Sequence, residues 1–72
     1  METYICQIKS AKGVHLDQLY QELLMIIGTY KDSYETTKMQ LVPSANCVLL
    51  TSNSLKLRAS LLKDEDFDIF FC

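Results

Sequence analysis

The sequence predicts an α+β domain in which strands and helices follow one another in the order β-α-β-β-α-β. Three observations support this order. Residues 15–31 and 54–63 repeat apolar side chains every three or four positions, which is the spacing of a helix with a buried face. Four other stretches are rich in β-branched, aromatic and other apolar residues, as strands are. Short polar segments separate these elements, so the sequence predicts a single domain over residues 1–72.

The first strand is predicted over residues 3–9, where side chains alternate between two sets. These sets are Tyr4, Cys6 and Ile8 on one side, and Ile5, Gln7 and Lys9 on the other. A loop around Gly13 follows, and the first helix is predicted over residues 15–31. Its apolar stripe consists of Leu16, Leu19, Tyr20, Leu23, Ile26, Ile27 and Tyr30.

A hairpin is predicted next, with strands over residues 34–42 and 46–52 joined by a turn at Pro43. The second of these strands is a nearly continuous apolar run, which is typical of a central strand. Ser52, Asn53 and Ser54 are candidates to cap a short helix over residues 54–63. The acidic run that follows ends this helix, and residues 67–72 form the fourth predicted strand.

This order of elements is the split βαβ, ferredoxin-like pattern. The expected architecture is therefore a four-stranded antiparallel sheet in the spatial order 4-1-3-2, with both helices on one face. An α+β fold of another topology is the alternative.

A sheet with helices on one face leaves its other face uncovered. We expect the helices to cover the larger apolar set: Tyr4, Cys6, Ile8, Met39, Leu41, Cys47, Leu49, Phe67, Ile69 and Phe71. The opposite positions then gather Ile5, Val48, Leu50 and Phe70 into one apolar patch. Its expected rim is Lys9, Lys38, Gln40 and Asp68. The alternatives are that a loop or chain end covers this patch, or that a strand register is shifted by one residue.

Exposed apolar patches of this size usually mark contact surfaces. We therefore predict that Ile5, Val48, Leu50 and Phe70 bind a partner protein, with Asp64, Glu65 and Asp66 as a polar rim or second contact. The fourth strand is also a predicted edge, with free backbone groups that another strand can pair with. The simplest partner is a second copy of the chain, which gives a homodimer through the open sheet face or the strand edge.

Composition excludes several other classes of protein. A net charge of −2 lacks the basic surface of a nucleic-acid binder, so we expect no nucleic-acid partner. No apolar run approaches the length of about 20 residues that a membrane span requires, and the first residues do not resemble a signal peptide. We expect a cytoplasmic protein, in the host cytoplasm if a virus encodes it, with no membrane partner. Three cysteines without CxxC spacing favour free thiols, with a Cys6–Cys47 disulfide as the alternative.

Residues that carry chemistry are few. His15 is the one histidine, and no nucleophile, base and orienting group are spaced as a catalytic set. The acidic residues 64–68 lack the glycine and the spacing of a calcium loop. Glycine-rich phosphate loops are also missing. We therefore predict no catalytic, cofactor-binding or metal-binding residues, and no cofactor.

Three stretches resemble a known group of proteins. They are TYICQIKSAKGVHLDQLYQELL, VLLTSNSLKLRASLL and DFDIFFC. In element order, in the passage around Thr51 and Ser52, and in the final D-F-D strand, they look like the small ferredoxin-like superfamily of CRISPR adaptation endonuclease subunits and GhoS-type antitoxin endoribonucleases. The resemblance implies the fold and a tendency to dimerise through sheet edges. The CRISPR branch commonly carries an aspartate after its first strand for metal-dependent cleavage, whereas IKSAKG has no carboxylate here.

Together these observations favour a small non-enzymatic interaction module, a regulator or inhibitor that binds a partner protein stoichiometrically. A phage or mobile-element protein of the anti-defence type fits this description. The first alternative is a ferredoxin-like RNA-binding protein or metal-dependent endoribonuclease of the antitoxin kind. The second is a subunit of an obligate protein complex.

Overall fold

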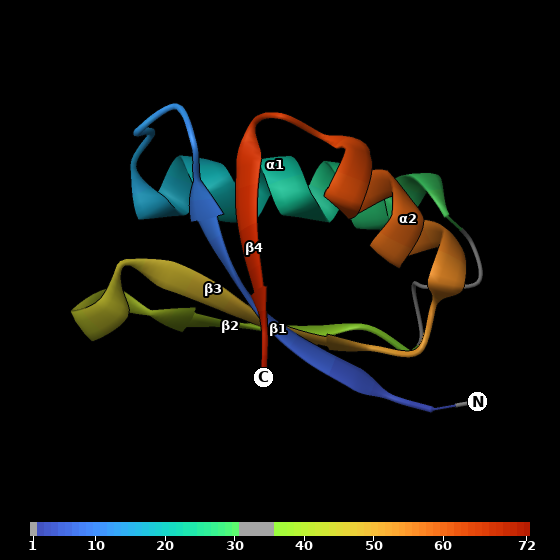
Figure 1. The fold of residues 1–72 in the computed structure, drawn as a ribbon. Coiled ribbons are helices and arrows are strands. Elements are labelled where there is room, and N and C mark those ends of the chain that lie inside the picture. The colour runs from blue at the N-terminus through green and yellow to red at the C-terminus, as the bar shows by residue number, and fades with distance from the viewer. Residues whose placement is uncertain (1, 31–35) are drawn as a thin grey trace.

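One antiparallel sheet and two helices make up the described part of the chain, which is residues 2–30 and 36–72 of a computed structural model (Figure 1). The strands are β1 Tyr4–Ser10, β2 Lys38–Val42, β3 Cys47–Ser52 and β4 Phe67–Phe71. The helices are α1 Leu16–Thr29 and α2 Leu55–Lys63, with a one-turn 3-10 helix, η1, at Pro43–Ala45. The predicted α+β class and the predicted four-stranded antiparallel sheet are confirmed.

The strands lie in the order β2-β3-β1-β4. Read from the opposite edge, this is β4-β1-β3-β2. Every neighbouring pair is antiparallel, and β2 and β4 form the two edges. Both helices lie on the same side of this sheet, above it in the view of Figure 1.

Helix α1 buries one face because Leu19, Leu23 and Ile27 recur at four-residue intervals. It begins after His15, whose carbonyl accepts a hydrogen bond from the N–H of Leu19 at 2.9 Å. It ends at Thr29, two residues before the predicted end at residue 31, which lies outside the described residues. The predicted helix is otherwise confirmed.

Strand β2 is shorter than predicted. The expected strand began at residue 34, but residues 34 and 35 lie outside the described residues and β2 begins at Lys38. The predicted turn at Pro43 is the 3-10 helix η1, with proline in its first turn. Asn46 then adopts a left-handed conformation with φ of 50°, which asparagine tolerates better than most residues, and leads directly into β3.

Helix α2 is capped as the sequence predicted. The Ser54 hydroxyl accepts a hydrogen bond from the N–H of Leu57 at 3.2 Å. Behind it, the Ser52 hydroxyl accepts the N–H of Ser54 at 3.1 Å and lies 2.7 Å from the Thr37 hydroxyl. These bonds satisfy the buried hydroxyls of Ser52 and Ser54 and fix the path from β3 into α2.

The hydrophobic core lies between the helices and one face of the sheet. Its buried members are Cys6, Ile8, Leu19, Leu23, Ile27, Val48, Leu50, Leu57, Leu61 and Phe67. Both helices and three strands contribute to this one cluster, so the helices cover a single face.

The register of β3 corrects the predicted assignment of faces. Cys6 pairs with Leu50 and Ile8 pairs with Val48, so these four side chains point to the same side of the sheet. Val48 and Leu50 are both 0% exposed. The prediction that they lie on the uncovered face is therefore wrong, and Leu49 points there instead. A run of four apolar residues carries no alternation, so its own pattern cannot decide which side faces the helices.

Candidate functional site

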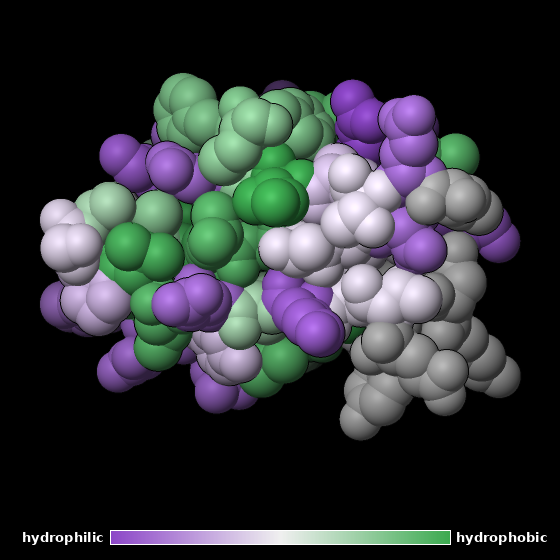
Figure 2. Space-filling view, turned by 90° about the horizontal axis from the view of Figure 1, so that it is seen from below, coloured by the Kyte–Doolittle hydropathy of each residue, from purple (hydrophilic) through white to green (hydrophobic). Residues whose placement is uncertain are grey.

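The face of the sheet away from the helices is not covered by either helix (Figure 1). Across the strands, one row of this face reads Gln40, Leu49, Gln7 and Phe70. The neighbouring row reads Lys38, Thr51 and Ile5, beside the chain end at Cys72. Figure 2, which views the molecule from this side, shows hydrophobic and hydrophilic side chains interleaved. We call Ile5, Leu49 and Phe70 with these polar neighbours the open face.

The apolar side chains of the open face do not lie directly opposite one another on neighbouring strands. Ile5 is 42% exposed and Phe70 is 54% exposed, and Leu49 is partly buried. Gln7 stands between Leu49 and Phe70 in the same row. Diagonal neighbours on a sheet remain within reach of long and aromatic side chains. The open face is therefore a mixed surface, with apolar anchors set among amides and lysines, rather than a continuous oily patch.

A cation lies over the aromatic anchor. The Lys9 ammonium is 6.0 Å from the centroid of the Phe70 ring. Lys9 pairs across the strands with Asp68, whose side chain points to the same side. The predicted rim of Lys9 and Asp68 is thus in place beside Phe70.

Two of the four apolar residues that were predicted to form the contact patch lie on the open face. Ile5 and Phe70 lie on it and are exposed, whereas Val48 and Leu50 are enclosed in the core. Sequence reasoning missed Leu49, because neither its type nor its neighbours distinguish it from Leu50. The pairing partners of β3 reveal it.

The acidic residues 64–66 lie elsewhere, in the loop from α2 to β4 at the end of the molecule where the helices lie (Figure 1). The Asp64 carboxylate accepts a hydrogen bond from the N–H of Asp66 at 2.9 Å. The Asp66 carboxylate lies 3.4 Å from the Lys12 ammonium, which also lies 3.5 Å from the Glu22 carboxylate. Desolvation acts to lower the pKa of Lys12, but these two carboxylates outweigh it and raise this pKa. Asp66 therefore links this loop to the loop that contains Lys12, and of the three acids Glu65 is the exposed one.

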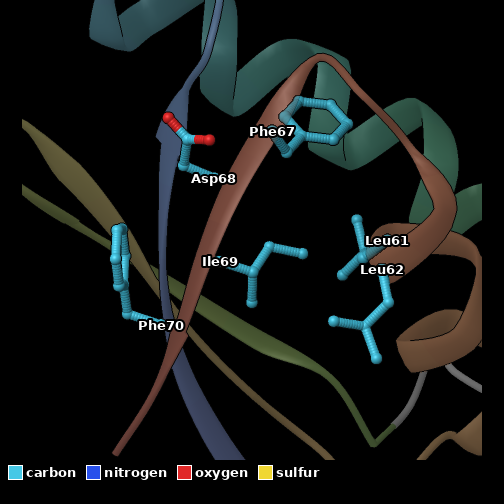
Figure 3. A pocket seen from close by; sticks show the side chains of 6 residues that line it. All are labelled: Leu61, Leu62, Phe67, Asp68, Ile69 and Phe70. Carbon is cyan, nitrogen blue, oxygen red and sulfur yellow. The ribbon is translucent and has the colours of Figure 1, made fainter.

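A groove runs beside β4 on its outer edge. It has a volume of about 220 Å³ and is lined by Leu61, Leu62, Phe67, Asp68, Ile69 and Phe70. Figure 3 shows Ile69 pointing from the strand toward Leu61 and Leu62 of α2, with Asp68 and Phe70 on the other side of the strand. Leu62 is 56% exposed, so the helix side of this groove is open to solvent.

An arginine covers the C-terminal end of the same strand. The Arg58 guanidinium lies 4.7 Å from the centroid of the Phe71 ring and 5.7 Å from that of Tyr4. The two rings contact each other edge to face, with centroids 6.2 Å apart. The Tyr4 hydroxyl donates a hydrogen bond to the Ser54 carbonyl at 2.8 Å. This cluster ties the end of β4 to α2.

Cys6 does not have the environment of a nucleophile. All three thiols are free, and Cys6 and Cys47 point to opposite sides of the sheet, because Cys6 is paired with Leu50, three residues along β3 from Cys47. Burial raises the pKa of Cys6 to about 11, the Cys72 thiol acts in the same direction, and Arg58 acts against both. A reactive cysteine needs a lowered pKa, so Cys6 is a small core residue. His15 is exposed at the start of α1.

Within residues 2–30 and 36–72, no three histidine, cysteine or acidic side chains come together as a metal-binding group. Neither helix of this described part is long and apolar enough to cross a membrane. No family model, curated protein or solved structure matches the chain.

Proposed function

We propose that the protein is a small interaction module that regulates or inhibits a partner protein by stoichiometric binding through the open face. The observation that carries this proposal is the exposure of Ile5 and Phe70 on the sheet face that lies away from both helices (Figure 1). Aromatic and aliphatic anchors surrounded by polar side chains are the usual arrangement at protein interfaces. An anti-defence inhibitor carried by a phage or mobile element is the biological class that this proposal favours.

We also propose that the fold is ferredoxin-like. The element order β-α-β-β-α-β and the strand neighbours β4-β1-β3-β2 support this assignment. In such a fold the helices stay on one face by construction, because each crossover connection is right-handed. An open face is then a property of the architecture, and the side chains that it displays decide what it binds.

The experiment compares two double variants that introduce the same charges. Ile5→Asp with Phe70→Asp changes the open face, and Met25→Asp with Leu55→Asp changes exposed apolar positions on the two helices. Each variant and the wild-type protein are used to capture partners from host lysate, and a captured protein is then purified and titrated calorimetrically. All three proteins are first checked for cooperative thermal unfolding.

We expect the wild type and the helix variant to bind one equivalent of partner per chain, and the open-face variant to bind at least about 100-fold more weakly. A partner that binds the open-face variant as tightly as the wild type contradicts the proposal.

One observation favours a second function, binding of single-stranded RNA. An aromatic ring on a sheet face under a lysine, as Phe70 lies under Lys9, is the kind of platform on which bases stack. The test is incubation with single-stranded RNA and magnesium, with and without a chelator. Binding that Phe70→Leu abolishes supports an RNA role, and cleavage that stops on chelation supports the endoribonuclease alternative. RNA that is neither bound nor cut leaves the protein-binding proposal as the better one.

A further inference from the structure

We propose that two copies of the chain associate edge to edge through β4, so that their two sheets become one. This inference rests on the proposed function, to which it adds a second copy of the chain as a partner. It uses the groove beside β4 rather than the centre of the open face.

The backbone of β4 has unpaired groups on its outer side. The N–H of Cys72 donates to the carbonyl of Ile5, and the N–H of Ala11 donates to the carbonyl of Asp66, both at 2.9 Å. The even-numbered residues of this strand therefore turn their polar groups toward β1. Because these directions alternate along an antiparallel strand, the N–H and C=O groups of Phe67, Ile69 and Phe71 point outward from the edge.

The β4 edge lacks the features with which proteins usually prevent such pairing. Lysines, prolines and bulges protect edge strands. The other edge, β2, begins at Lys38 and is followed directly by Pro43. Strand β4 reads FDIFF, with one charge and neither lysine nor proline. Of the two edge strands, β4 is therefore the one better suited to pair with another strand.

The groove accommodates the side chains of an added strand. An incoming strand lies about 4.8 Å from its neighbour, and alternate side chains point to the same face of the sheet. On the helix side, these side chains enter the groove between Ile69 and Leu62 (Figure 3). Backbone pairing combined with a pocket for alternate side chains is the general mode of strand addition.

A second copy of β4 fits this edge symmetrically. With a twofold axis at Ile69, Ile69 faces its own copy and Phe67 faces Phe71 of the second chain. All three outward residues then form hydrogen-bonded pairs. A shift by two residues in either direction leaves one of the three without a partner within the strand. The strand is therefore self-complementary in one register.

Charges support the same register. On the open-face side, Asp68 of one copy stands opposite Phe70 of the other, whose ring lies 6.0 Å from its own Lys9 ammonium. Each carboxylate is thus placed beside a lysine of the opposite copy, and this contact occurs twice. One of the shifted registers instead sets the two Asp68 side chains against each other, which is unfavourable.

The test is sedimentation equilibrium of the full chain over a concentration series. Wild type should reach a mass of twice 8.3 kDa. The matched variants are Leu62→Lys, in the groove, and Leu55→Lys, which is 61% exposed at the other end of the same helix. We expect Leu62→Lys to weaken association at least about tenfold and Leu55→Lys to leave it unchanged.

A third variant separates this inference from the proposed function. Ile5→Lys changes the open face without touching the groove, so it should leave the dimer intact. If Ile5→Lys disrupts the dimer and Leu62→Lys does not, the two copies associate through the open face. That result overturns the edge inference but leaves the proposed binding face in place. Loss of partner binding by Ile5→Lys with an unchanged dimer supports both.

Amide hydrogen exchange gives a readout of the backbone itself. In dilute protein the amides of Ile69 and Phe71 should exchange quickly, whereas the amide of Phe70 is already bonded to β1. At high concentration the first two should become protected, and that of Phe70 should change least. A chain that stays monomeric throughout the series, or equal exchange of these amides at both concentrations, overturns the inference.

Discussion

Leu49 and Leu50 are adjacent, chemically identical and on opposite faces of the sheet, so they test the β3 register directly. Leu50 is 0% exposed and belongs to the core, whereas Leu49 is partly buried on the open face. We predict that Leu50→Ala destabilises the protein far more than Leu49→Ala does.

The magnitude follows from the atoms removed. Replacing leucine by alanine deletes three carbon atoms, which at about 0.8 kcal/mol each gives about 2.4 kcal/mol for a fully buried side chain. The cavity that remains raises this to about 3–5 kcal/mol. At Leu49 part of the side chain is already hydrated and no enclosed cavity forms, so the loss should be about 1 kcal/mol or less. A domain of this size has a total stability of only about 4–10 kcal/mol.

The assay is thermal and urea-induced unfolding followed by circular dichroism, because the chain has no tryptophan. Leu50→Ala should lower the melting temperature by more than about 12 °C. Leu50→Val and Leu49→Val, which remove one carbon each, extend the comparison if Leu50→Ala is too unstable to measure. Equal losses at the two positions, or a greater loss at Leu49, would refute the register and with it the open face described here.

Four further predictions concern the capping network, the aromatic cluster and the thiols, with two of them on the thiols. Ser54→Ala removes the hydroxyl that caps α2 and should cost about 1 kcal/mol in urea unfolding, and Ser54→Asp should restore part of it. Tyr4→Phe removes a 2.8 Å hydrogen bond while keeping the ring, so it should lower the free energy of unfolding by about 0.5–1.5 kcal/mol. It should also change the near-ultraviolet circular dichroism, and an unchanged spectrum would contradict a fixed environment for the Tyr4 ring. Cys6 has a pKa raised from 9.0 to about 11. The contribution of its buried, neutral thiol to the stability of the fold is therefore present below pH 9 and is lost as pH rises toward 11. The stability difference between wild type and Cys6→Ala should therefore shrink by about 2 kcal/mol across this range, and a constant difference contradicts the burial of Cys6. In native protein a thiol reagent should modify exposed Cys72 and spare Cys6 until unfolding, as mass spectrometry of the labelled peptides will show.

Strands that alternate could be assigned to their faces from the sequence. In β1, Cys6 and Ile8 are apolar opposite Gln7 and Lys9, and this contrast correctly places Ile5 on the open face. In β4, Asp68 is polar between apolar Phe67 and Ile69, and Phe70 lies on the same side as Asp68, so this contrast likewise places Phe70 on the open face. Period-two alternation is sufficient where one side of a strand is clearly more polar.

Strand β3 could not be assigned in this way. Its two sides carry nearly equal apolar content, and the side that faces the helices also includes Ser52. That hydroxyl is tolerated in the interior because it bonds to Thr37 and to the backbone of Ser54. Since these partners lie in other segments, only the folded structure reveals why a serine, and not Leu49, points inward.

The partners of the acidic residues 64–66 also could not be predicted from the sequence. The sequence reveals three consecutive acids, but their partners are chosen by the tertiary structure, which brings Lys12 to Asp66. Charge clusters predicted from sequence therefore identify a loop without showing whether its charges are available to a partner protein.

Phe70 connects the two surfaces that we propose, because its side chain belongs to the open face and also lines the β4 groove. In a monomer it stands at the margin of a four-stranded sheet. In a β4-paired dimer it lies near the middle of an eight-stranded sheet, and the anchors Ile5, Leu49 and Phe70 occur twice across the twofold axis. A symmetric dimer then binds two equivalents of partner. Phe70→Asp should consequently impair both self-association and partner binding, whereas Leu62→Lys impairs only the first and Ile5→Lys only the second.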